Sequence, residues 1–416
     1  MRIDRCKGTQ DLTPAEMKKF RFIEGIFRDC CVKWGYEEVR TPTLEYLHLF
    51  TSTGTLTPGR LGRVYSFLDW DGWSGERVVM RPDGTIPIAR LYISTEERDK
   101  PARFFYVTNV FVFEETGKET REKWQCGVEL IGAGSIVADI ELISLALEVL
   151  KKAGIKNIRL RLSHAGLIRS LLEKFGLSEE EQAKAFDDIL DGDEKVLARM
   201  KAEKPELSRI LTPLLDMKGQ SSGFLKNVKA LFNHDFPELQ QSLDNFVSVV
   251  EMLEAIGINY RIDIASGRGF EYYTGIIYQL MAGGQHIGGG GRYDALIPLM
   301  GGNDVPASGF ALYLDRLMEM VKQEPAAGPD SIKVLVKAEH AQMKEAFKLI
   351  SGLHDAGYIA EIHTGDKEPG DGNWLIEVRG EEPYYIVKET ASQEISEVST
   401  KNEVLKIISK GDSGHK

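Results

Sequence analysis

The stretch that most constrains the fold runs from residue 260 to 294 and reads YRIDIASGRGFEYYTGIIYQLMAGGQHIGGGGRYD. Apolar and polar residues alternate over 260–265, and a second β-rich run follows at 276–280, so two strands are expected to flank SGRGFEYYTG. Four consecutive glycines, 288–291, cost conformational entropy on folding without adding side-chain packing. We therefore expect a ligand or a neighbouring backbone to approach closely there. A simple hairpin end is the alternative.

The same stretch concentrates polar groups that suit a small zwitterion. Arg268 can pair with a carboxylate in a forked geometry. The hydroxyls of Tyr272 and Tyr273, together with Glu271, can accept hydrogen bonds from an ammonium or an imidazole. No phosphate-loop spacing of the form G-x-x-x-x-G-K-[ST] is present. Tyrosines that only pack a sheet are the competing interpretation.

Length, charge and cysteine usage limit the class of protein. A chain of 416 residues is long enough for two or three domains. Its net charge of -11 argues against nonspecific nucleic-acid binding as the main role. Four cysteines without C-x-x-C spacing predict neither a zinc site nor a disulfide framework, so we expect no metal and a reducing cytoplasm. The polar N-terminus and the lack of a long apolar run predict no membrane role.

Polar residues also interrupt apolar runs in the first half of the chain. Asp83 and Thr85 lie in a turn rich in Pro and Gly, where side chains commonly face a site. Capping of the helix that begins near Pro87 is the alternative role. The spacing of Gln125 and Glu129 places both on one face of a strand. If that face points inward, both need partners or a ligand, and a solvated face is the alternative.

The pattern along the chain predicts an α+β protein with several parts. A core covers 1–322, and a helical insertion at about 165–257 interrupts its sheet. A Pro/Gly/Ala linker at 323–331 leads to a small α/β domain at 332–416. Within the core, 136–153 reads as an amphipathic helix. Arg316 is expected in the first turn of another helix, where it either pairs with an acidic neighbour or receives an anion.

Seven ordered motifs resemble those of histidyl-tRNA synthetases and their paralogues. They are KGTQDLTP, GYEEVRTPTLEY, RPDGTIPIAR, QCGVELIG, GRGFEYYTG, GGRYD and PASGFALYLDRL. The resemblance covers roughly residues 7–320 and, more weakly, an anticodon-binding-like domain over 331–410. It implies the class II aminoacyl-tRNA synthetase core, an antiparallel sheet flanked by helices. It also implies a homodimer formed through the segment around 37–45.

The resemblance further implies a histidine-binding pocket. Asp83 and Thr85 match residues that meet the amino group of the ligand. Gln125 and Arg268 match the residues at its carboxylate end. Glu129, Tyr273 and Tyr293 match the residues that line the imidazole end. Tyr272 is also expected to bind the ligand. The synthetases usually carry Glu where Asp83 stands.

The phosphate grip departs from the synthetase pattern. Where synthetases carry Phe-Arg-x-Glu, whose Arg holds the α-phosphate of ATP, this chain reads FVFE at 111–114. A charge-assisted contact of this kind is commonly worth about 3 orders of magnitude in rate. The loop that follows is rich in acidic residues. Val112, Glu114 and Arg316 are therefore predicted to form a vestigial ATP site, with no catalytic residue and with adenylate formation lost.

The motif RPDGTIPIAR and the run GVELIG look more like the regulatory subunits of ATP phosphoribosyltransferase, paralogues that sense histidine for the first step of histidine biosynthesis. This resemblance implies a noncatalytic cytoplasmic subunit with histidine as ligand, no cofactor, and a short-form catalytic subunit as partner. Histidine would shift the complex towards an inhibited state. The short acidic segment DKEPGDG argues against tRNA as a partner. Alternatives are a histidine–tRNA ligase with an altered ATP grip and a pseudo-synthetase scaffold with an empty pocket.

Overall fold

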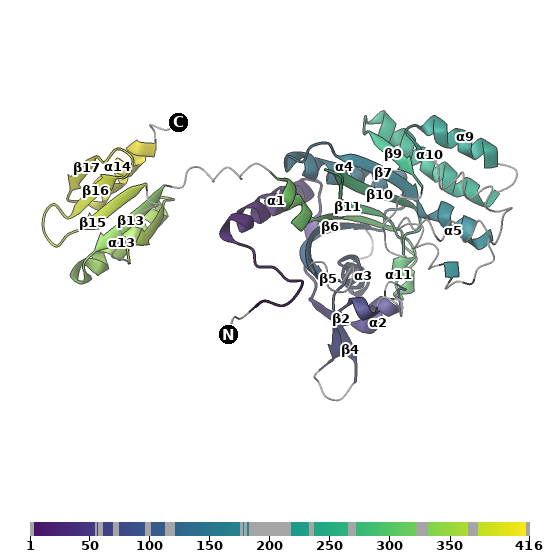
Figure 1. Ribbon diagram of the computed structural model, residues 1–416, viewed down its shortest axis with the longest axis horizontal. Coiled ribbons are helices and arrows are strands. Elements are labelled where there is room, and N and C mark those ends of the chain that lie inside the picture. The colour runs from purple at the N-terminus through teal and green to yellow at the C-terminus, as the bar shows by residue number, and fades with distance from the viewer. Residues whose placement is uncertain are drawn as a thin grey trace. The chain divides into compact units, whose positions relative to one another are not determined.

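The computed structural model folds into two compact units, Met1–Gln323 and Glu324–Lys416 (Figure 1). It describes residues 4–54, 56, 61–69, 75–95, 101–112, 121–174, 178, 181–182, 218–232, 237–264, 272–321, 332–364 and 373–412. Several predicted features lie outside these ranges: Glu114, Arg268, Glu271, the linker 323–331 and most of the insertion between 183 and 217.

A nine-stranded sheet forms the frame of the first unit. In spatial order its strands are β1 (Glu37–Glu38), β5 (Ala102–Phe111), β6 (Glu122–Ile131), β12 (Ala307–Tyr313), β11 (Gln285–Arg292), β10 (Ile276–Ala282), β7 (Arg159–His164), β9 (Tyr260–Asp263) and β8 (Lys218–Gly219). Neighbouring strands are antiparallel except for the pairs β1–β5 and β7–β9. The predicted fold class, a largely antiparallel sheet flanked by helices, is confirmed.

Helices cover both faces of this sheet. In Figure 1, α1 (Pro14–Lys33) and α4 (Ile136–Lys152) lie on one side of β6 and β11, and α3 (Thr85–Ser94) and α11 (Leu296–Leu299) lie on the other. The remaining described helices of this unit are α2 (Leu47–Thr51), α5 (Ala165–Lys174), α9 (Ser222–Phe232), α10 (Gln240–Ala255) and α12 (Leu314–Met320), with short 3-10 turns η1 (Leu61–Arg63) and η2 (Pro237–Leu239). Buried apolar side chains of α1 and α4 join the strands in one core.

The run of four glycines is a central strand of the sheet. Gly288 to Gly291 belong to β11, which pairs with β10 on one side and β12 on the other. A Cβ atom added at Gly289 would lie 2.5 Å from the Tyr278 carbonyl oxygen. The hairpin-end interpretation is therefore wrong, because interior sheet backbone approaches these residues from both sides. The expectation that a neighbouring backbone approaches closely is confirmed.

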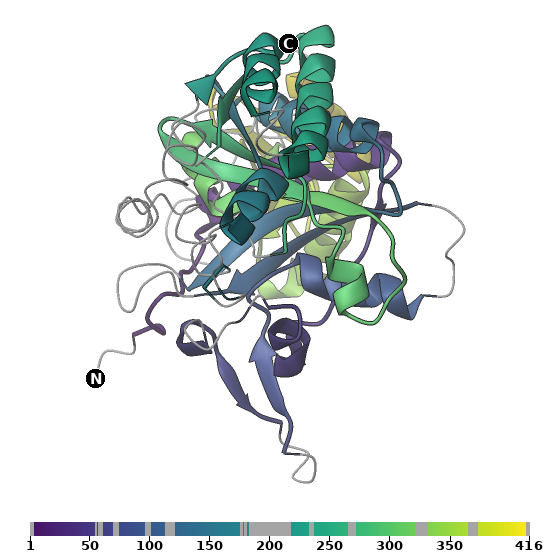
Figure 2. The same ribbon diagram turned by 90° about the vertical axis from the view of Figure 1, so that its right-hand side faces the viewer.

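A separate three-stranded sheet projects from the first unit (Figures 1 and 2). Its strands are β2 (Leu44–Tyr46), β4 (Arg77–Met80) and β3 (Ser66–Leu68), with β4 in the middle. Leu44, Tyr46 and Phe67 leave 47%, 47% and 45% of their surface exposed. Register places them on one face, because Tyr46 and Phe67 both pair with Val78. We call this face, made by Leu44, Tyr46 and Phe67, the hairpin face.

The second unit is a small α/β domain with a five-stranded sheet. Its strands, in order, are β14 (Ile359–Ile362), β13 (Lys333–Ala338), β15 (Trp374–Val378), β16 (Tyr385–Glu389) and β17 (Ile395–Val398). The strands β14, β13 and β15 are parallel, and the other pairs are antiparallel. The helices α13 (Met343–Asp355) and α14 (Lys401–Asp412) complete its separate core, and η3 (His340–Gln342) precedes α13.

Within the described ranges, no helix is both long enough and apolar enough to cross a membrane. No group of three or more acidic, His or Cys side chains there is arranged to hold a metal ion.

Candidate functional site

Glu129 is the centre of a buried polar cluster in the first unit. It lies near the end of β6, and only 1% of its surface is exposed. The Thr85 hydroxyl donates to Glu129 Oε1 at 2.7 Å, and the Tyr106 hydroxyl donates to the same oxygen at 3.0 Å. The Tyr293 hydroxyl donates to Oε2. Three hydroxyls from separate elements therefore converge on one carboxyl group.

Asp83 lies beside this cluster at the start of α3. Its Oδ1 accepts a hydrogen bond from the Ile86 N–H at 2.8 Å, so it caps the helix as the alternative interpretation held. Its Oδ2 accepts from the Tyr272 hydroxyl at 3.4 Å. With only 4% of its surface exposed, Asp83 both begins a helix and faces the cluster. The two interpretations of this residue hold together.

Aromatic rings make the wall of the site. The rings of Tyr272 and Tyr273 meet edge to face with centroids 5.5 Å apart, and those of Tyr272 and Tyr293 do the same at 5.5 Å. A Cβ atom added at Gly291 would lie 2.9 Å from Tyr273 Cε1, so the glycine strand also makes room for this ring. Edge-to-face pairs of this kind fix the orientation of the hydroxyls they carry.

Glycines on the surrounding elements let the polar side chains fit. A Cβ atom at Gly309 of β12 would overlap the Glu129 carboxyl group, and one at Gly127 would overlap the Tyr106 ring. A Cβ atom at Gly84 would overlap the Gln125 amide, so Gln125 reaches the turn that carries Asp83. The absence of side chains at these three glycines is therefore a steric requirement of the site.

Burial dominates the electrostatics of the two carboxyl groups. It raises the pKa of Glu129 to about 8, although the hydrogen bonds from Tyr293, Thr85 and Tyr106 oppose this shift. Burial likewise raises the pKa of Asp83 to about 6, against hydrogen bonds from backbone N–H groups and Tyr272. Glu129 is therefore mainly protonated at neutral pH in the empty site. The site can receive a cation or a basic ring.

The structure brings together seven of the eight predicted histidine-binding residues. They are Asp83, Thr85, Gln125, Glu129, Tyr272, Tyr273 and Tyr293. Arg268 lies outside the described residues. Sequence reasoning missed Tyr106, because a tyrosine in a β-rich run reads as sheet packing. The signal that could have found it is Gly127 directly opposite on β6, which leaves room for an inward-facing ring.

The predicted vestigial ATP site lies at the far end of the β5–β6 hairpin. The Val112 N–H donates to the Arg121 carbonyl oxygen at 3.0 Å, so a guanidinium-bearing residue stands directly across the hairpin from the lost Arg position. Arg121 Nη1 donates to the Tyr65 hydroxyl at 3.3 Å, and its stem packs against Gly8. Arg121 was not predicted. Because Arg121 follows a loop rich in acidic residues, its position in the sequence did not indicate a role at this site.

The other two residues of the predicted vestigial ATP site are Glu114 and Arg316. Glu114 lies outside the described residues. Arg316 is in the first turn of α12, as expected, and forms no ion pair with any carboxylate in the described part of the chain. Its neighbour Asp315 instead accepts a hydrogen bond from the Trp124 N–H at 2.8 Å. The expected pairing of Arg316 with an acidic neighbour is therefore not seen among these residues.

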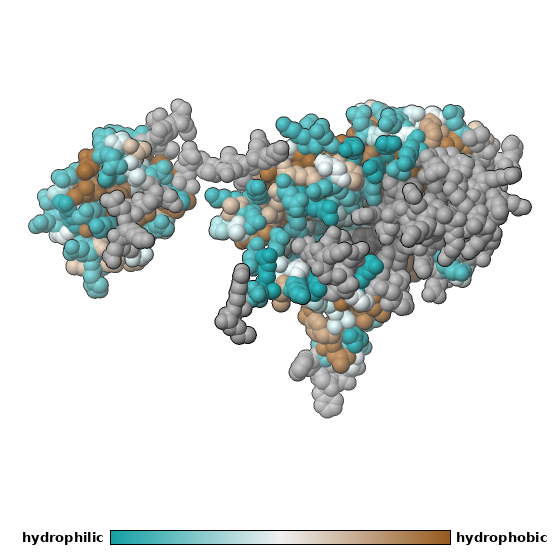
Figure 3. Space-filling model, in the orientation of Figure 1, coloured by the Kyte–Doolittle hydropathy of each residue, from teal (hydrophilic) through white to brown (hydrophobic). Residues whose placement is uncertain are grey.

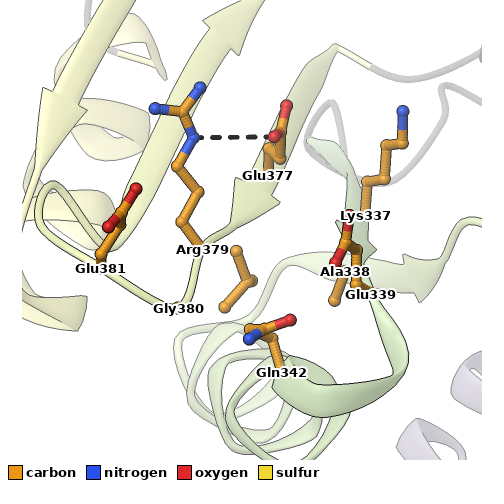
Figure 4. A pocket seen from close by; sticks show the side chains of 9 residues that line it. Lys337, Ala338, Glu339, Gln342, Glu377, Arg379, Gly380 and Glu381 are labelled. Atoms are coloured by element: carbon orange, nitrogen blue, oxygen red, sulfur yellow. Dashed lines mark ion pairs between the residues drawn. The ribbon is translucent and has the colours of Figure 1, made fainter.

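The second unit carries an open cleft of about 500 Å³ at the carboxyl ends of β13 and β15 (Figure 4). Its charged lining residues are Lys337, Glu339, Glu377, Arg379 and Glu381. Arg379 Nε lies 3.6 Å from Glu377 Oε1, and most of these side chains are exposed. Two cations and three carboxylates nearly cancel, so the cleft offers no strongly basic surface.

Comparison with known proteins places this geometry in a family. Residues 8–317 match the family described as histidyl-tRNA synthetase. An ATP phosphoribosyltransferase regulatory subunit from Dehalococcoides mccartyi strain BAV1 is 49% identical over 98% of both chains. A histidine–tRNA ligase from Archaeoglobus fulgidus is 35% identical and covers 87% of this chain and 86% of its own length.

Solved structures support the same fold. An ATP phosphoribosyltransferase regulatory subunit/histidyl-tRNA synthetase from Bacillus halodurans superposes with a TM-score of 0.72 at 24% identity, over 87% of this chain and 93% of its own. Histidyl-tRNA synthetase from Nostoc superposes with the same TM-score at 19% identity, over 98% and 99%. The chain therefore belongs to the ATP phosphoribosyltransferase regulatory subunits, a branch of the histidyl-tRNA synthetase family.

Proposed function

We propose that this protein is a noncatalytic regulatory subunit that binds histidine in the Glu129 cluster and assembles with a short-form ATP phosphoribosyltransferase catalytic subunit. The observation that carries the proposal is the pair of buried carboxyl groups, Asp83 and Glu129, held by five described hydrogen bonds. Val112 also supports the proposal, because the Arg that holds the α-phosphate of ATP in the synthetases is absent at this position.

The ligand follows from the chemistry of the site. Asp83 can accept hydrogen bonds from an α-ammonium group, and Glu129 and the tyrosine hydroxyls around it can form hydrogen bonds with an imidazole. A pocket built from such groups discriminates strongly, since a ligand without matching donors leaves buried polar atoms unpaired. Histidine carries both groups on one small skeleton.

Calorimetric titration of the full chain with histidine and, separately, with ATP tests the proposal. We expect histidine to bind and ATP to give no heat of binding. Asp83→Asn should weaken histidine binding about 10- to 100-fold, because hydrogen bonds to charged groups contribute about 1.5–3 kcal/mol. Glu319→Gln, on the exposed side of α12, is the matched control and should bind as the wild type does. Absence of histidine binding at millimolar concentration would refute the sensor role.

The catalytic partner is tested by assembly. Mixed with a short-form ATP phosphoribosyltransferase catalytic subunit, the chain should co-elute in gel filtration, and histidine should inhibit the mixture but not the catalytic subunit alone. Histidine would act by binding one arrangement of the complex more tightly, a coupling of typically about 1–3 kcal/mol. Inhibition that is equal with and without this chain would contradict the role.

The proposal includes a homodimer formed through the hairpin face and the neighbouring segment 37–45. Brown surface gathers on the projecting sheet in Figure 3. Leu44, Tyr46 and Phe67, which make the hairpin face of this sheet, are each exposed over almost half of their surface. Tyr46→Glu should shift the molecular mass in solution from dimer to monomer. Phe347→Glu is the control, because Phe347 is more exposed than Tyr46, at 59% against 47%, but lies on α13 of the second unit. An unchanged mass for the Tyr46 variant would remove this face from the interface.

The second unit supports the expectation that tRNA is not a partner. An RNA-binding surface is usually basic, because phosphate neutralisation supplies most of its affinity. The cleft of the second unit instead carries one net negative charge. Filter binding with histidine tRNA at low salt should therefore show no saturable complex, and a submicromolar complex would contradict this part of the proposal.

One observation favours a second candidate, the histidine–tRNA ligase. Arg121 stands across the hairpin from Val112 and could supply the missing contact to ATP. Histidine-dependent exchange of pyrophosphate into ATP distinguishes the two functions. Robust exchange that Arg121→Ala abolishes would replace the regulatory role with the ligase. A pseudo-synthetase scaffold predicts neither exchange nor histidine binding.

A further inference from the structure

The proposed histidine site contains two carboxyl groups that no described cation neutralises. Within the described part of the chain, Glu129 contacts only hydroxyl groups, and Asp83 contacts backbone N–H groups and one hydroxyl. Removing an ionised carboxylate from water costs several kcal/mol, whereas each neutral hydrogen bond returns about 1 kcal/mol. The empty site is therefore unfavourable for a charge on Glu129.

The groups that face Glu129 come from every element packed around it. Thr85 approaches from α3, Tyr106 from β5, Tyr293 from the segment after β11, and Asp83 from the turn before α3. Tyr272 and Tyr273, in the segment before β10, also interact with Glu129. Burial raises the pKa of each of these four tyrosines well above 10, so none of them gives up a proton near neutrality. Asp83 is the only other described group there that titrates close to pH 7. Glu129 is therefore the group in this cluster that can give up a proton near neutral pH.

We propose that Glu129 donates its proton to the imidazole ring of the histidine whose binding was proposed above. The carboxyl O–H bond breaks, an N–H bond forms on the ring nitrogen that faces Glu129, and a carboxylate–imidazolium pair results. No other reactant is needed, and the total charge of the site and ligand is unchanged. Once the proton has left, the Thr85, Tyr106 and Tyr293 hydroxyls, which all lie within hydrogen-bond distance of Glu129, can donate to the carboxylate that forms and stabilise it.

Glu129 is on this account a specificity-determining residue. A ring basic enough to take the proton gains an ion pair in a dry site, where such pairs with good geometry are strong. A ring of the same shape that stays neutral gains only ordinary hydrogen bonds. Glu129 and the imidazole ring share one proton in the complex. Before binding, the two groups together carry one proton when the pH lies between the ring pKa of about 6.5 and the Glu129 pKa of about 8, so histidine binding is tightest in that pH range.

Infrared difference spectroscopy of the full chain tests the transfer. At pH 7.5 the addition of histidine should remove a protonated-carboxyl C=O band and add carboxylate bands. 1,2,4-Triazole-3-alanine, which has the same shape and a ring that stays neutral, should leave that band in place. Calorimetry at the same pH should show histidine binding at least about tenfold more tightly than this analogue, since charged hydrogen bonds exceed neutral ones by a kcal/mol or more.

The variant Glu129→Gln locates the band. It keeps an oxygen that accepts the hydroxyls but has no proton to give, so the band change and the preference for histidine should both vanish. If histidine binds while the carboxyl band persists, or if both ligands bind equally well, the proton transfer is refuted and the histidine site stands. If histidine does not bind at all, the proposed function itself is refuted. Should the variant fold poorly, the two ligands on the wild-type chain still decide.

Discussion

Carboxyl groups occupy opposite environments in the two units of this protein. In the first unit, Asp83, Glu129 and Asp139 are buried, and each is bonded to particular neighbours. In the cleft of the second unit, Glu339 and Glu381 are exposed. Water hydrates the exposed carboxyl groups, whereas the buried carboxyl groups depend on hydrogen bonds from protein partners or from a ligand. The buried carboxyl groups therefore respond most strongly to the loss of a partner, which is why the proposed ligand site is in the first unit.

The largest effect is expected where a buried ion pair is broken. Arg292 on β11 lies 2.8 Å from Asp139 on α4, and both side chains are almost fully buried. Arg292→Met should lower the free energy of unfolding by about 3–5 kcal/mol in chemical denaturation, because it leaves Asp139 buried without its partner. The double variant Arg292→Met/Asp139→Leu should recover much of this loss. A loss below about 1 kcal/mol in the single variant would show that leaving Asp139 buried without Arg292 costs less than expected.

The next effect is a dependence of stability on pH through Glu129. Its pKa is raised from the usual 4.5 to about 8 by burial, so between these values the folded chain holds a proton that the unfolded chain has released. The free energy of unfolding should therefore fall as pH rises from 5 to 8, by at most about 1.4 kcal/mol per pH unit. Urea denaturation across this range should show a flatter profile for Glu129→Gln. Identical slopes would mean that Glu129 is ionised in the empty site.

A smaller loss is expected from filling the space beside Glu129. A Cβ atom at Gly309 would overlap its carboxyl group, so Gly309→Ala should lower stability by about 1–3 kcal/mol and weaken histidine binding. Gly25→Ala is the matched control, because nothing lies within 4 Å of a Cβ there and the residue is inside α1. It should stabilise the chain by about 0.5–1 kcal/mol. Equal effects at both glycines would contradict the steric role of Gly309.

The smallest effect is expected in the cleft of the second unit. Glu377 and Arg379 are 3.6 Å apart with side chains partly open to water. Glu377→Gln should change the free energy of unfolding by less than about 1 kcal/mol and should leave histidine binding unchanged. The same two measurements used for the other variants check this. A fall in histidine affinity would show that the second unit contributes to the site.

Local patterns predicted most of the elements correctly. The amphipathic run at 136–153 is α4, and the helix expected to carry Arg316 in its first turn is α12. The helix cap expected of Asp83 also forms, with its Oδ1 accepting from the Ile86 N–H at 2.8 Å. These predictions succeeded because periodicity and caps depend on neighbours within a few positions along the chain.

Local patterns were not sufficient where the deciding contact is distant in sequence. The sequence left open whether a ligand, a neighbouring backbone or a hairpin end explains the glycine run, and the structure shows an interior strand whose glycines make room for β10, β12 and Tyr273. Tyr106 and Arg121 went unnoticed, since neither stands in a pattern that marks a site. Their roles depend on Glu129 and on the segment around Gly8, which folding brings to them.

The sequence by itself determined the family, the order of helices and strands, and the kinds of side chain available to a ligand, because all of these are written in local pattern and motif order. Only the tertiary structure decided which carboxyl groups lose water and which hydroxyls surround them. Burial is a property of the packed whole, so the raised pKa of Glu129 could not be read from the residues beside it.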